Sequence, residues 1–394
     1  MTKQLNVPIL RFSEFLDVWE SKNLGQVLTI GSGRDYKHLD NGNVPVFGTG
    51  GYMSSVDTPL HTGESVFIGR KGSIDKPFYY EGDFWTVDTL FYTKNFVGVT
   101  PKFTYNLFQR INWKLYNEAT GVPSLSKATI QKIRVNLPTL PEQQKIASFL
   151  SKVDEKIGLL TEKKDKLAEY KKGVMQQLFN GKWEKQDGQL TFIPPTLRFK
   201  ADDGSDFPDW EEVSLGDVLI PTFREVDKPS NNYLAIGVRS HCKGTFQKPD
   251  SEPDKVAMDK LYVVRAGDLI VNITFAWEGA IAIVKDEDDG GYVSHRFPTY
   301  LFDEDRLLGS FFESLFKQKR FRFDLDLISP GGAGRNRVLS KKEFLKLTVS
   351  VPSINEQKKI SEGLTLVQQK LDLANSELEK AKEWKKGLLQ QMFV

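Results

Sequence analysis

The chain has little cysteine: one residue, Cys242, among 394. A single thiol cannot form an internal disulfide, and it cannot build a zinc site from cysteines. We therefore expect a protein of a reducing compartment, the cytoplasm.

Long apolar runs and a strong net charge are also missing. No stretch approaches about 18 uncharged apolar residues, so we expect no membrane span. The first ten residues lack a basic segment followed by an apolar run, and we expect no signal peptide. Net charge is only +2. Nucleic-acid binding would therefore need a local group of Lys and Arg.

Familiar catalytic signatures are absent too. The segments GTGG (48–51) and GGAG (331–334) fall short of a dinucleotide fingerprint, and no phosphate-binding loop or Asn/Asp-Pro-Pro-aromatic tetrad occurs. The acidic-x-Lys spacing of a nuclease core fails near 249–255. No histidine forms the H-E-x-x-H motif; the four are His38, His61, His241 and His295. We expect no catalytic residue, no metal site and no bound cofactor in this chain.

What the sequence does contain is a long internal repeat. EYKKGVMQQLF (169–179) returns as EWKKGLLQQMF (383–393), and the match extends back to Leu125 and Leu339 without a gap. About 22 of the 55 positions from 125 to 179 are identical to the second copy. Such self-similarity is the first test of architecture, and it predicts two related halves.

A weaker match opens each half, at 17–30 and 208–221. It pairs Trp19 with Trp210 at an offset of 191, against 214 in the repeat, so the second half is 23 residues longer. The Gly- and Pro-containing stretch 179–199 is typical of a linker. The plan is a variable region followed by a shared segment, twice.

Each shared segment is predicted to be a long helix. Prolines stand just before the Glu-Gln pair, where a helix can start, and none follows within the segment. Apolar residues then recur in steps of four and three over about five heptads, which is the pattern of a coiled coil. Three lysines interrupt the pattern: Lys164, Lys171 and Lys385.

A helix of about 38 residues would be about 57 Å long and must cover its apolar seam. The other copy is the obvious antiparallel partner, since a long insert separates the two. The alternative is that each helix packs separately on its own domain. Gly173 and Gly387 occupy equivalent places, where Gly costs about 1 kcal/mol against Ala. They indicate either close helix approach or a local break.

The variable regions have mostly β patterning, rich in β-branched and aromatic residues, followed by helical stretches at 101–117 and 307–325. Each region is predicted to be a small α+β domain. Polar loops with Gly, Lys and Arg interrupt the strands; such loops suit close approach to DNA phosphates and base edges, while the alternative is ordinary surface turns. The loops lie at 30–42, 47–55, 68–74, 236–247, 273–280 and 329–341.

With these features in view, the chain resembles the specificity (S) subunits of type I restriction–modification systems. The resemblance rests on the repeat, the LPTLPEQQKI lead-in (137–146) and the KKGLLQQMF ending (385–393). It implies an α+β protein with two globular target-recognition domains separated by an antiparallel two-helix coiled coil, with an internal pseudo-twofold repeat. The expected parts are a first recognition domain (1–140), a first long helix (141–180), a linker (181–198), a second recognition domain (199–354) and a second long helix (355–394).

The same resemblance implies a non-catalytic chain in a prokaryotic cytoplasm. Its expected partners are double-stranded DNA, methyltransferase (M) subunits, two of them, and restriction/translocase (R) subunits. S-adenosylmethionine, ATP and Mg²⁺ belong on those partners, which methylate adenine or translocate and cleave DNA. Because the variable halves differ, we expect a bipartite, asymmetric DNA target with one domain per half-site.

By resemblance, the loops around Arg70 and 274–279, and the lead-ins 121–127 and 332–341, should approach DNA. The predicted DNA-binding residues are Arg34, Tyr36, Lys37, Thr49, Tyr52, Arg70, Lys71, Ser124, Lys127, Arg224, Arg239, His241, Lys243, Thr274, Trp277, Arg335, Arg337 and Lys341.

The mechanism that follows is a molecular ruler. A rigid helix pair can hold two reading domains about one turn of DNA apart, roughly 34–36 Å. Two other readings stay open: a coiled-coil protein-interaction scaffold that never touches DNA, and a standalone enzyme with an unrecognised site. Steep salt dependence of DNA binding would favour the first reading over the scaffold.

Overall fold

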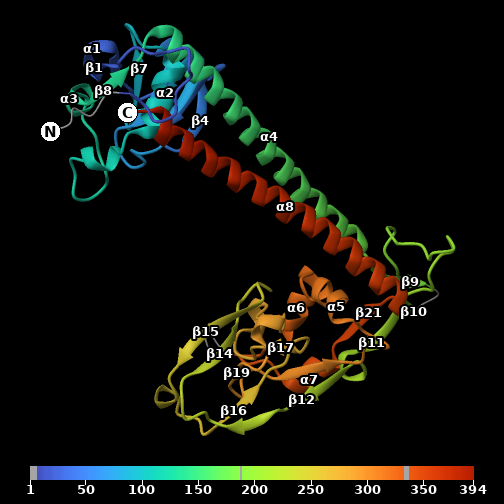
Figure 1. The fold of residues 1–394 in the computed structure, drawn as a ribbon. Coiled ribbons are helices and arrows are strands. Elements are labelled where there is room, and N and C mark those ends of the chain that lie inside the picture. The colour runs from blue at the N-terminus through green and yellow to red at the C-terminus, as the bar shows by residue number, and fades with distance from the viewer. Residues whose placement is uncertain (1–6, 187–188, 332–336) are drawn as a thin grey trace. The chain divides into compact units, whose positions relative to one another are not determined.

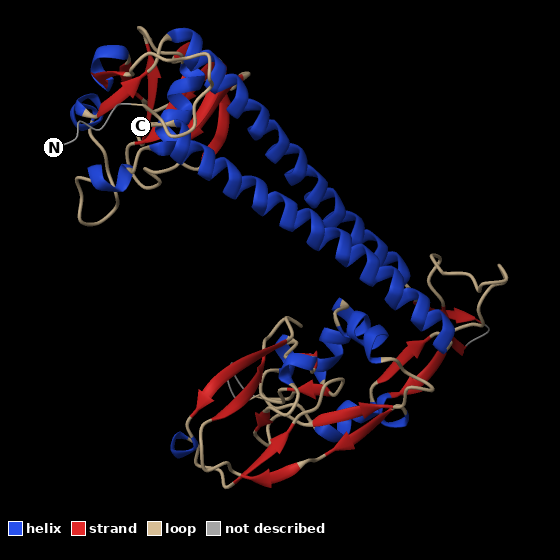
Figure 2. Ribbon diagram, in the orientation of Figure 1, coloured by secondary structure: helices blue, strands red, loops and turns tan. Residues whose placement is uncertain are grey.

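The computed structural model describes residues 7–186, 189–331 and 337–394. They form two units, residues 1–164 with 373–394 and residues 165–372. Each unit combines a β-rich domain with part of both long helices (Figures 1 and 2). Within the described ranges, no helix is long and apolar enough to cross a membrane.

The first unit is built on a six-stranded sheet in the order β2-β7-β5-β6-β3-β4. Its neighbouring strands are antiparallel except β3 and β6, which are parallel. The small β1–β8 ladder ties the start of the domain to the lead-in of the first long helix. The strands are β1 (Glu20–Asn23), β2 (Thr29–Ser32), β3 (Val44–Gly48), β4 (Gly51–Val56), β5 (His61–Gly69), β6 (Phe78–Thr86), β7 (Leu90–Lys94) and β8 (Arg134–Leu137).

Short helices complete this domain. The predicted helical stretch 101–117 is divided, because the helix ends at Arg110 and a 3-10 turn follows. Ser126 caps the last short helix, since its side chain accepts a hydrogen bond from the Thr129 N–H. These elements are α1 (Leu24–Val27), α2 (Pro101–Arg110), η1 (Trp113–Tyr116) and α3 (Lys127–Lys132).

The second unit has a five-stranded sheet, β13-β16-β19-β14-β15, and a four-stranded sheet, β12-β20-β17-β18. A β11–β21 ladder repeats the role of β1–β8, and the hairpin β9–β10 precedes it in the chain. The strands are β9 (Lys182–Gln186), β10 (Gln189–Ile193), β11 (Glu211–Ser214), β12 (Leu219–Thr222), β13 (Glu225–Asp227), β14 (Tyr233–Val238), β15 (Thr245–Ser251), β16 (Lys260–Val263), β17 (Leu269–Val271), β18 (Ile281–Ile283), β19 (Tyr292–Val293), β20 (Thr299–Phe302) and β21 (Thr348–Val351).

Helices of the second unit follow the same plan as those of the first. The predicted stretch 307–325 is two helices, and Ser340 caps α7 as Ser126 caps α3. The helices are α5 (Gly309–Phe316), α6 (Lys319–Leu327) and α7 (Lys341–Lys346), and the 3-10 turns are η2 (Leu215–Asp217), η3 (Pro253–Lys255), η4 (Ala276–Glu278) and η5 (Asp286–Asp288).

The two long helices, α4 (Leu140–Leu178) and α8 (Ile354–Met392), each contain 39 residues. They pack side by side (Figure 1). As the residue number rises along α4 it falls along α8, so the pairing is antiparallel. The contacts are Asp154–Lys385 (2.6 Å), Lys163–Glu377 (3.1 Å) and Lys171–Gln368. The predicted α+β fold and the helix pairing are confirmed; the helices are not packed separately.

These contacts repeat under the offset of 214. Lys171 and Lys385 are equivalent positions, and so are their partners Gln368 and Asp154. Two of the lysines that interrupt the apolar seam, Lys171 and Lys385, therefore have polar partners on the opposite helix. Lys163 and Glu377 are equivalent to each other, so this ion pair marks the centre of the pseudo-twofold repeat.

The repeated endings complete the core of the other half's domain. Leu388, Met392 and Phe393 of the second copy pack in the hydrophobic core of the first unit. Leu178 of the first copy packs in the core of the second unit, together with Phe179. Each repeat thus begins its helix on one domain and ends it in the core of the other.

Neither predicted role of the helix glycines is observed. The helices continue through Gly173 and Gly387 without a break. A Cβ added at either position would meet nothing within 4 Å, so no close approach requires Gly there.

Candidate nucleic-acid interface

The Glu-Gln pair at the start of each long helix anchors that helix to its domain. Glu142, with a side chain 1% exposed, accepts hydrogen bonds from Arg11 Nε (2.7 Å), Arg11 Nη2 (2.8 Å) and Trp19 Nε1 (3.3 Å). In the second half Arg198 donates to Glu356 in the same way, at 3.0 and 2.7 Å. These charge-assisted pairs hold the start of each helix against its own domain.

The glutamines repeat an equally specific pattern. Gln143 Oε1 accepts from the Thr100 N–H at 2.9 Å, and its amide donates to two backbone carbonyls. Gln357 accepts from the Leu308 N–H at 2.9 Å and also donates to two carbonyls. The lead-in motif is therefore explained by helix anchoring within each unit.

In the first unit, the tight turn between β6 and β7 brings several candidate loops together. Its carbonyl oxygens accept backbone hydrogen bonds from Arg34 (to Thr86, 2.8 Å) and from Arg70 (to Thr89, 2.8 Å). The Val87 N–H donates to the Phe47 carbonyl at 2.9 Å, which ties in the third loop. Three loops distant in sequence thus meet at one edge of the sheet.

The segment 121–127 joins the same group of loops. Gly72 N–H donates to the Pro123 carbonyl at 2.9 Å, Leu125 N–H donates to the Arg70 carbonyl at 2.9 Å, and Lys71 pairs with Ser124 in a β-bridge. Gly72 has φ +83°, a left-handed conformation that favours glycine.

The side chains of this group are mostly exposed and cationic. Arg34, Lys37, Arg70 and Lys71 face solvent, and Tyr52 is 65% exposed. Tyr36 differs, because it is partly buried against the Val44 and Trp85 cluster. Thr49, Ser124 and Lys127 are half-buried. The group offers cations and backbone at one edge, which suits contact with a polyanion.

In the second unit, the loop after β14 is held against η4. His241 and Cys242 have φ of 62° and 54°, and their N–H groups donate to the carbonyls of Glu278 (2.7 Å) and Gly279 (2.8 Å). This left-handed pair is stabilised by those bonds, and it leaves the side chains of His241 and Lys243 exposed.

Arg337 and Thr274 lie around the same turn. The Arg337 guanidinium is 5.1 Å from the Trp277 ring centroid and forms a 2.7 Å ion pair with Asp326. Thr274 Oγ1 accepts from Arg296 Nη1 at 3.2 Å. Leu339 N–H donates to the Ile273 carbonyl at 2.8 Å, the counterpart of the Leu125–Arg70 bond.

The remaining candidates are partly engaged elsewhere. Arg224 forms a bidentate pair with the buried Asp268, at 2.5 and 3.0 Å, so one donor on each terminal nitrogen has a structural partner. Arg239 donates to the Thr245 carbonyl at 2.6 Å and covers the Phe246 ring. Lys341 lies 5.9 Å from the Phe223 ring centroid. Arg335 falls outside the described residues.

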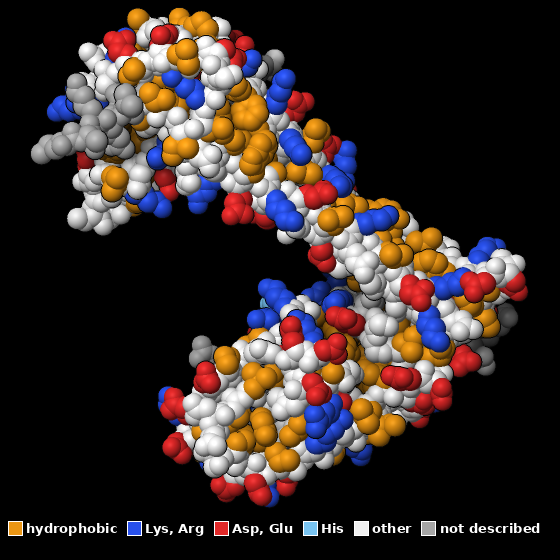
Figure 3. Space-filling model, in the orientation of Figure 1, with side chains coloured by type: hydrophobic (Ala, Val, Ile, Leu, Met, Phe, Trp, Pro, Cys, Tyr) orange, Lys and Arg blue, Asp and Glu red, His pale blue; other side chains and the backbone are white. Residues whose placement is uncertain are grey.

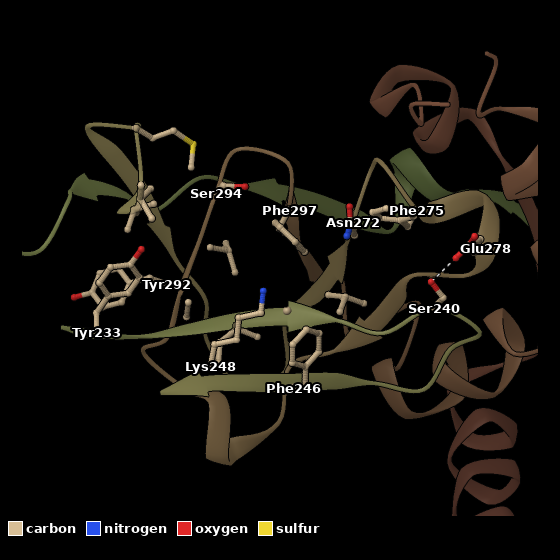
Figure 4. Close-up of a pocket in the computed structure, with 18 residues that line it drawn as sticks. Tyr233, Ser240, Phe246, Lys248, Asn272, Phe275, Glu278, Tyr292, Ser294 and Phe297 are labelled. Atoms are coloured by element: carbon tan, nitrogen blue, oxygen red, sulfur yellow. Dashed lines mark hydrogen bonds between the residues drawn. The ribbon is translucent and has the colours of Figure 1, made fainter. Parts of the chain in front are cut away.

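A hollow of about 480 Å³ lies on the five-stranded sheet of the second unit. Phe246, Phe275 and Phe297 line it, and Ser240 donates to Glu278 at 2.7 Å at its edge (Figure 4). Phe246 leans across Gly237, where an added Cβ would lie 2.3 Å from the ring. The hollow is mainly apolar and adjoins the turn that holds His241.

Sequence reasoning missed the turn 86–90, whose backbone organises the first group, and also Arg296. The turn carries no charge cluster or glycine signal; only its position between two strands could have pointed to it. Among the described residues, no three His, Cys, Asp or Glu side chains come together as metal ligands.

Comparison with known proteins adds the family. The model of the type I restriction modification DNA specificity domain matches residues 17–169 and 208–383. Among curated relatives, the type I restriction enzyme MjaVIII specificity subunit of Methanocaldococcus jannaschii is 24% identical over 70% of this chain, and the putative type I restriction enzyme MjaX specificity subunit of the same organism is 23% identical over 72%. The matches span 65% and 63% of those relatives' lengths.

Among solved structures, the crystal structure of a type I restriction-modification system S subunit from M. genitalium has a TM-score of 0.61 and 15% identity. It covers 98% of this chain and 99% of that chain, so the fold is shared over nearly the whole length. The family model matches both halves and well over half of the residues. The chain therefore belongs to the family of type I restriction-modification DNA specificity (S) subunits.

Proposed function

We propose that this chain is the DNA-reading subunit of a type I restriction–modification complex, with one domain for each half of a split site. The observation that carries the proposal is the family match in both halves, 17–169 and 208–383, on a scaffold whose anchors repeat. Each domain adds its own group of exposed cations and loop backbone to that scaffold.

We infer that the two half-sites differ. The equivalent bonds Leu125–Arg70 and Leu339–Ile273 place Arg70 and Lys71 in the first domain where the second has Ile273 and Thr274. Cations and a neutral pair cannot make the same hydrogen bonds to a base edge or phosphate. The target is therefore asymmetric.

The helix pair is proposed to fix the unread spacer between the half-sites. Each helix has 39 residues, and a buried glutamate bonds the start of each to its own domain. A rigid connection of this kind converts helix length into a separation between the recognised bases.

We propose that the helix pair also binds two methyltransferase (M) subunits, and that restriction/translocase (R) subunits join the complex. The support is a duplicated set of exposed apolar side chains, with Leu159 and Tyr170 on α4 at the positions equivalent to Leu373 and Trp384 on α8. Beside Trp384, a groove of about 390 Å³ is lined by both helices of the first unit. Exposed apolar groups repeated in this way fit one partner bound twice.

The reactions belong to those partners in this proposal. S-adenosylmethionine, ATP and Mg²⁺ bind to the M and R subunits, which methylate adenine or translocate and cleave DNA in the prokaryotic cytoplasm. This chain supplies recognition without catalysis.

The test is a methylome. A host expressing the chain with its M subunit should show methylation at a bipartite motif, and inserting one heptad into both helices should change the spacer and neither half-site. Exchanging one recognition domain should change one half-site only. An unchanged spacer after insertion would refute the ruler. If the assembled complex binds DNA without dependence on salt, or does not bind DNA, the protein-interaction scaffold is the better interpretation.

A further inference from the structure

One arginine of the second unit lies at the candidate interface without a side-chain partner among the described residues. Arg322 on α6 has a Nε atom that is buried and makes no hydrogen bond to any described residue. Its Cδ lies 3.4 Å from the position of a Cβ added at Gly279, so the side chain packs under the turn that holds His241 and Cys242. An unpaired, partly desolvated guanidinium is costly in free energy, and because its Nε is buried an anion would bind through the terminal Nη groups.

The surroundings of Arg322 are cationic. Burial raises the pKa of the Cys242 thiol, and the positive charges of Arg322 and Lys317 offset part of that rise. Burial lowers the pKa of Lys171, and nearby Lys317 lowers it further. Lys and Arg side chains gather over the part of the second unit formed by α5 and α6 (Figure 3).

Acidic groups only partly neutralise this cluster. Glu313 pairs with Lys317 at 2.8 Å, and Asp324 pairs with Arg320, which is 81% exposed. Asp372 also faces Lys171. Among the described residues, no carboxylate is paired with Arg322. The first turn of α6 contains Lys319 and Arg320, has no acidic residue and no side-chain cap, so its N–H groups add to the positive field.

We propose that Arg322, with Lys317 and the first turn of α6, is a binding site for one backbone phosphate of the DNA. This inference rests on the proposed function and deepens it, because it assigns a sequence-independent anchor to the second domain. The anchor adjoins the base-reading candidates, since the turn over Arg322 carries His241 and Lys243. In the first domain a 3-10 turn follows α2 where the second domain has α6, so its described residues offer no equivalent phosphate site.

The experiment compares Arg322→Gln with the native chain, each assembled with M subunits, in binding to a duplex that contains the target. Loss of one phosphate contact should weaken binding about 10-fold at low salt and reduce the slope of log affinity against log salt by about 0.9 between about 50 and 200 mM. The methylated motif should stay the same, because a phosphate contact carries no base information.

Lys255→Gln is the matched control. Lys255 belongs to the same unit, is 74% exposed and pairs with Glu252, so the variant loses the same charge at a surface position. If Arg322→Gln binds like Lys255→Gln, with an unchanged salt slope, the phosphate site is wrong. If the native complex itself fails to bind DNA, the proposed function fails, and the two failures are therefore distinguishable.

A second measurement tests the site on the native complex, in case the Arg322→Gln variant does not fold. Neutral methylphosphonate groups are placed one at a time along the half-site of the second domain. At one of these positions the substitution should weaken DNA binding by the native complex about 10-fold. Arg322→Lys keeps the charge without the fork and should retain part of that effect. If no methylphosphonate position weakens DNA binding by the native complex, the proposal is overturned.

Discussion

Removing the buried glutamate that anchors the first long helix should destabilise the first unit strongly. In Glu142→Ala, the Arg11 side chain, only 11% exposed, loses a carboxylate that accepts at 2.7 and 2.8 Å, and Trp19 loses its acceptor. Breaking one partner of a buried, hydrogen-bonded pair costs about 3–5 kcal/mol, because the other charge stays buried without compensation.

The chain supplies a control for this prediction. Glu377 pairs with Lys163 at 3.1 Å, but the two side chains are 42% and 53% exposed, so Glu377→Ala should cost less than about 1 kcal/mol. Hydrogen exchange read by mass spectrometry reports each unit separately. Glu142→Ala should speed exchange in β1, β8 and the start of α4, while Glu356→Ala should do the same in the second unit. Equal effects of Glu142→Ala and Glu377→Ala would refute the assignment of an anchor.

Three further results are expected. Gly173→Ala and Gly387→Ala should each raise the free energy of unfolding by about 0.5–1 kcal/mol in urea titrations, since the new methyl meets open space in a continuous helix; destabilisation would contradict this. Burial raises the pKa of Cys242 from 9.0 to about 11, so alkylation near neutral pH should be about 100-fold slower in the native chain than after unfolding; equal rates would exclude a buried thiol. Burial raises the pKa of Tyr300 to about 12. The stabilising contribution of its neutral phenol should therefore be present below about pH 10 and lost as pH rises to about 12. Thermal unfolding measured at a series of pH values should show a smaller loss of stability in Tyr300→Phe than in the native chain.

The helix pair could be predicted because its signal is local and repeated. Apolar steps of four and three, the prolines at the start and the gapless offset of 214 each point to long helices that pair. The interrupting lysines could not be placed in advance. Lys385 is buried, yet it bonds to Asp154 and to Gln109 and lies 5.5 Å from the Tyr105 ring centroid. Such a partner comes from another part of the fold, so spacing alone cannot reveal it.

The candidate site was less accessible to sequence reasoning, because sheet pairing decides which loops meet. Arg34 and Arg70 come together through the carbonyls of Thr86 and Thr89, which carry no sequence signal of binding. Arg224 looked like any loop arginine, but the fold pairs it with buried Asp268. Arg322 was overlooked because it belongs to a predicted helix, and its lack of a partner among the described residues is visible only in three dimensions.

The ion pair at the centre of the repeat has a consequence for isolated half-chains. Two copies of the first half, associating through α4 in the same antiparallel way, would bring Lys163 against Lys163; two copies of the second would oppose Glu377 to itself. Like charges there repel, whereas joining unlike halves gives attraction. The Lys163–Glu377 pair at the centre of the repeat thus favours pairing of the two helices within one intact chain over a dimer of identical half-chains.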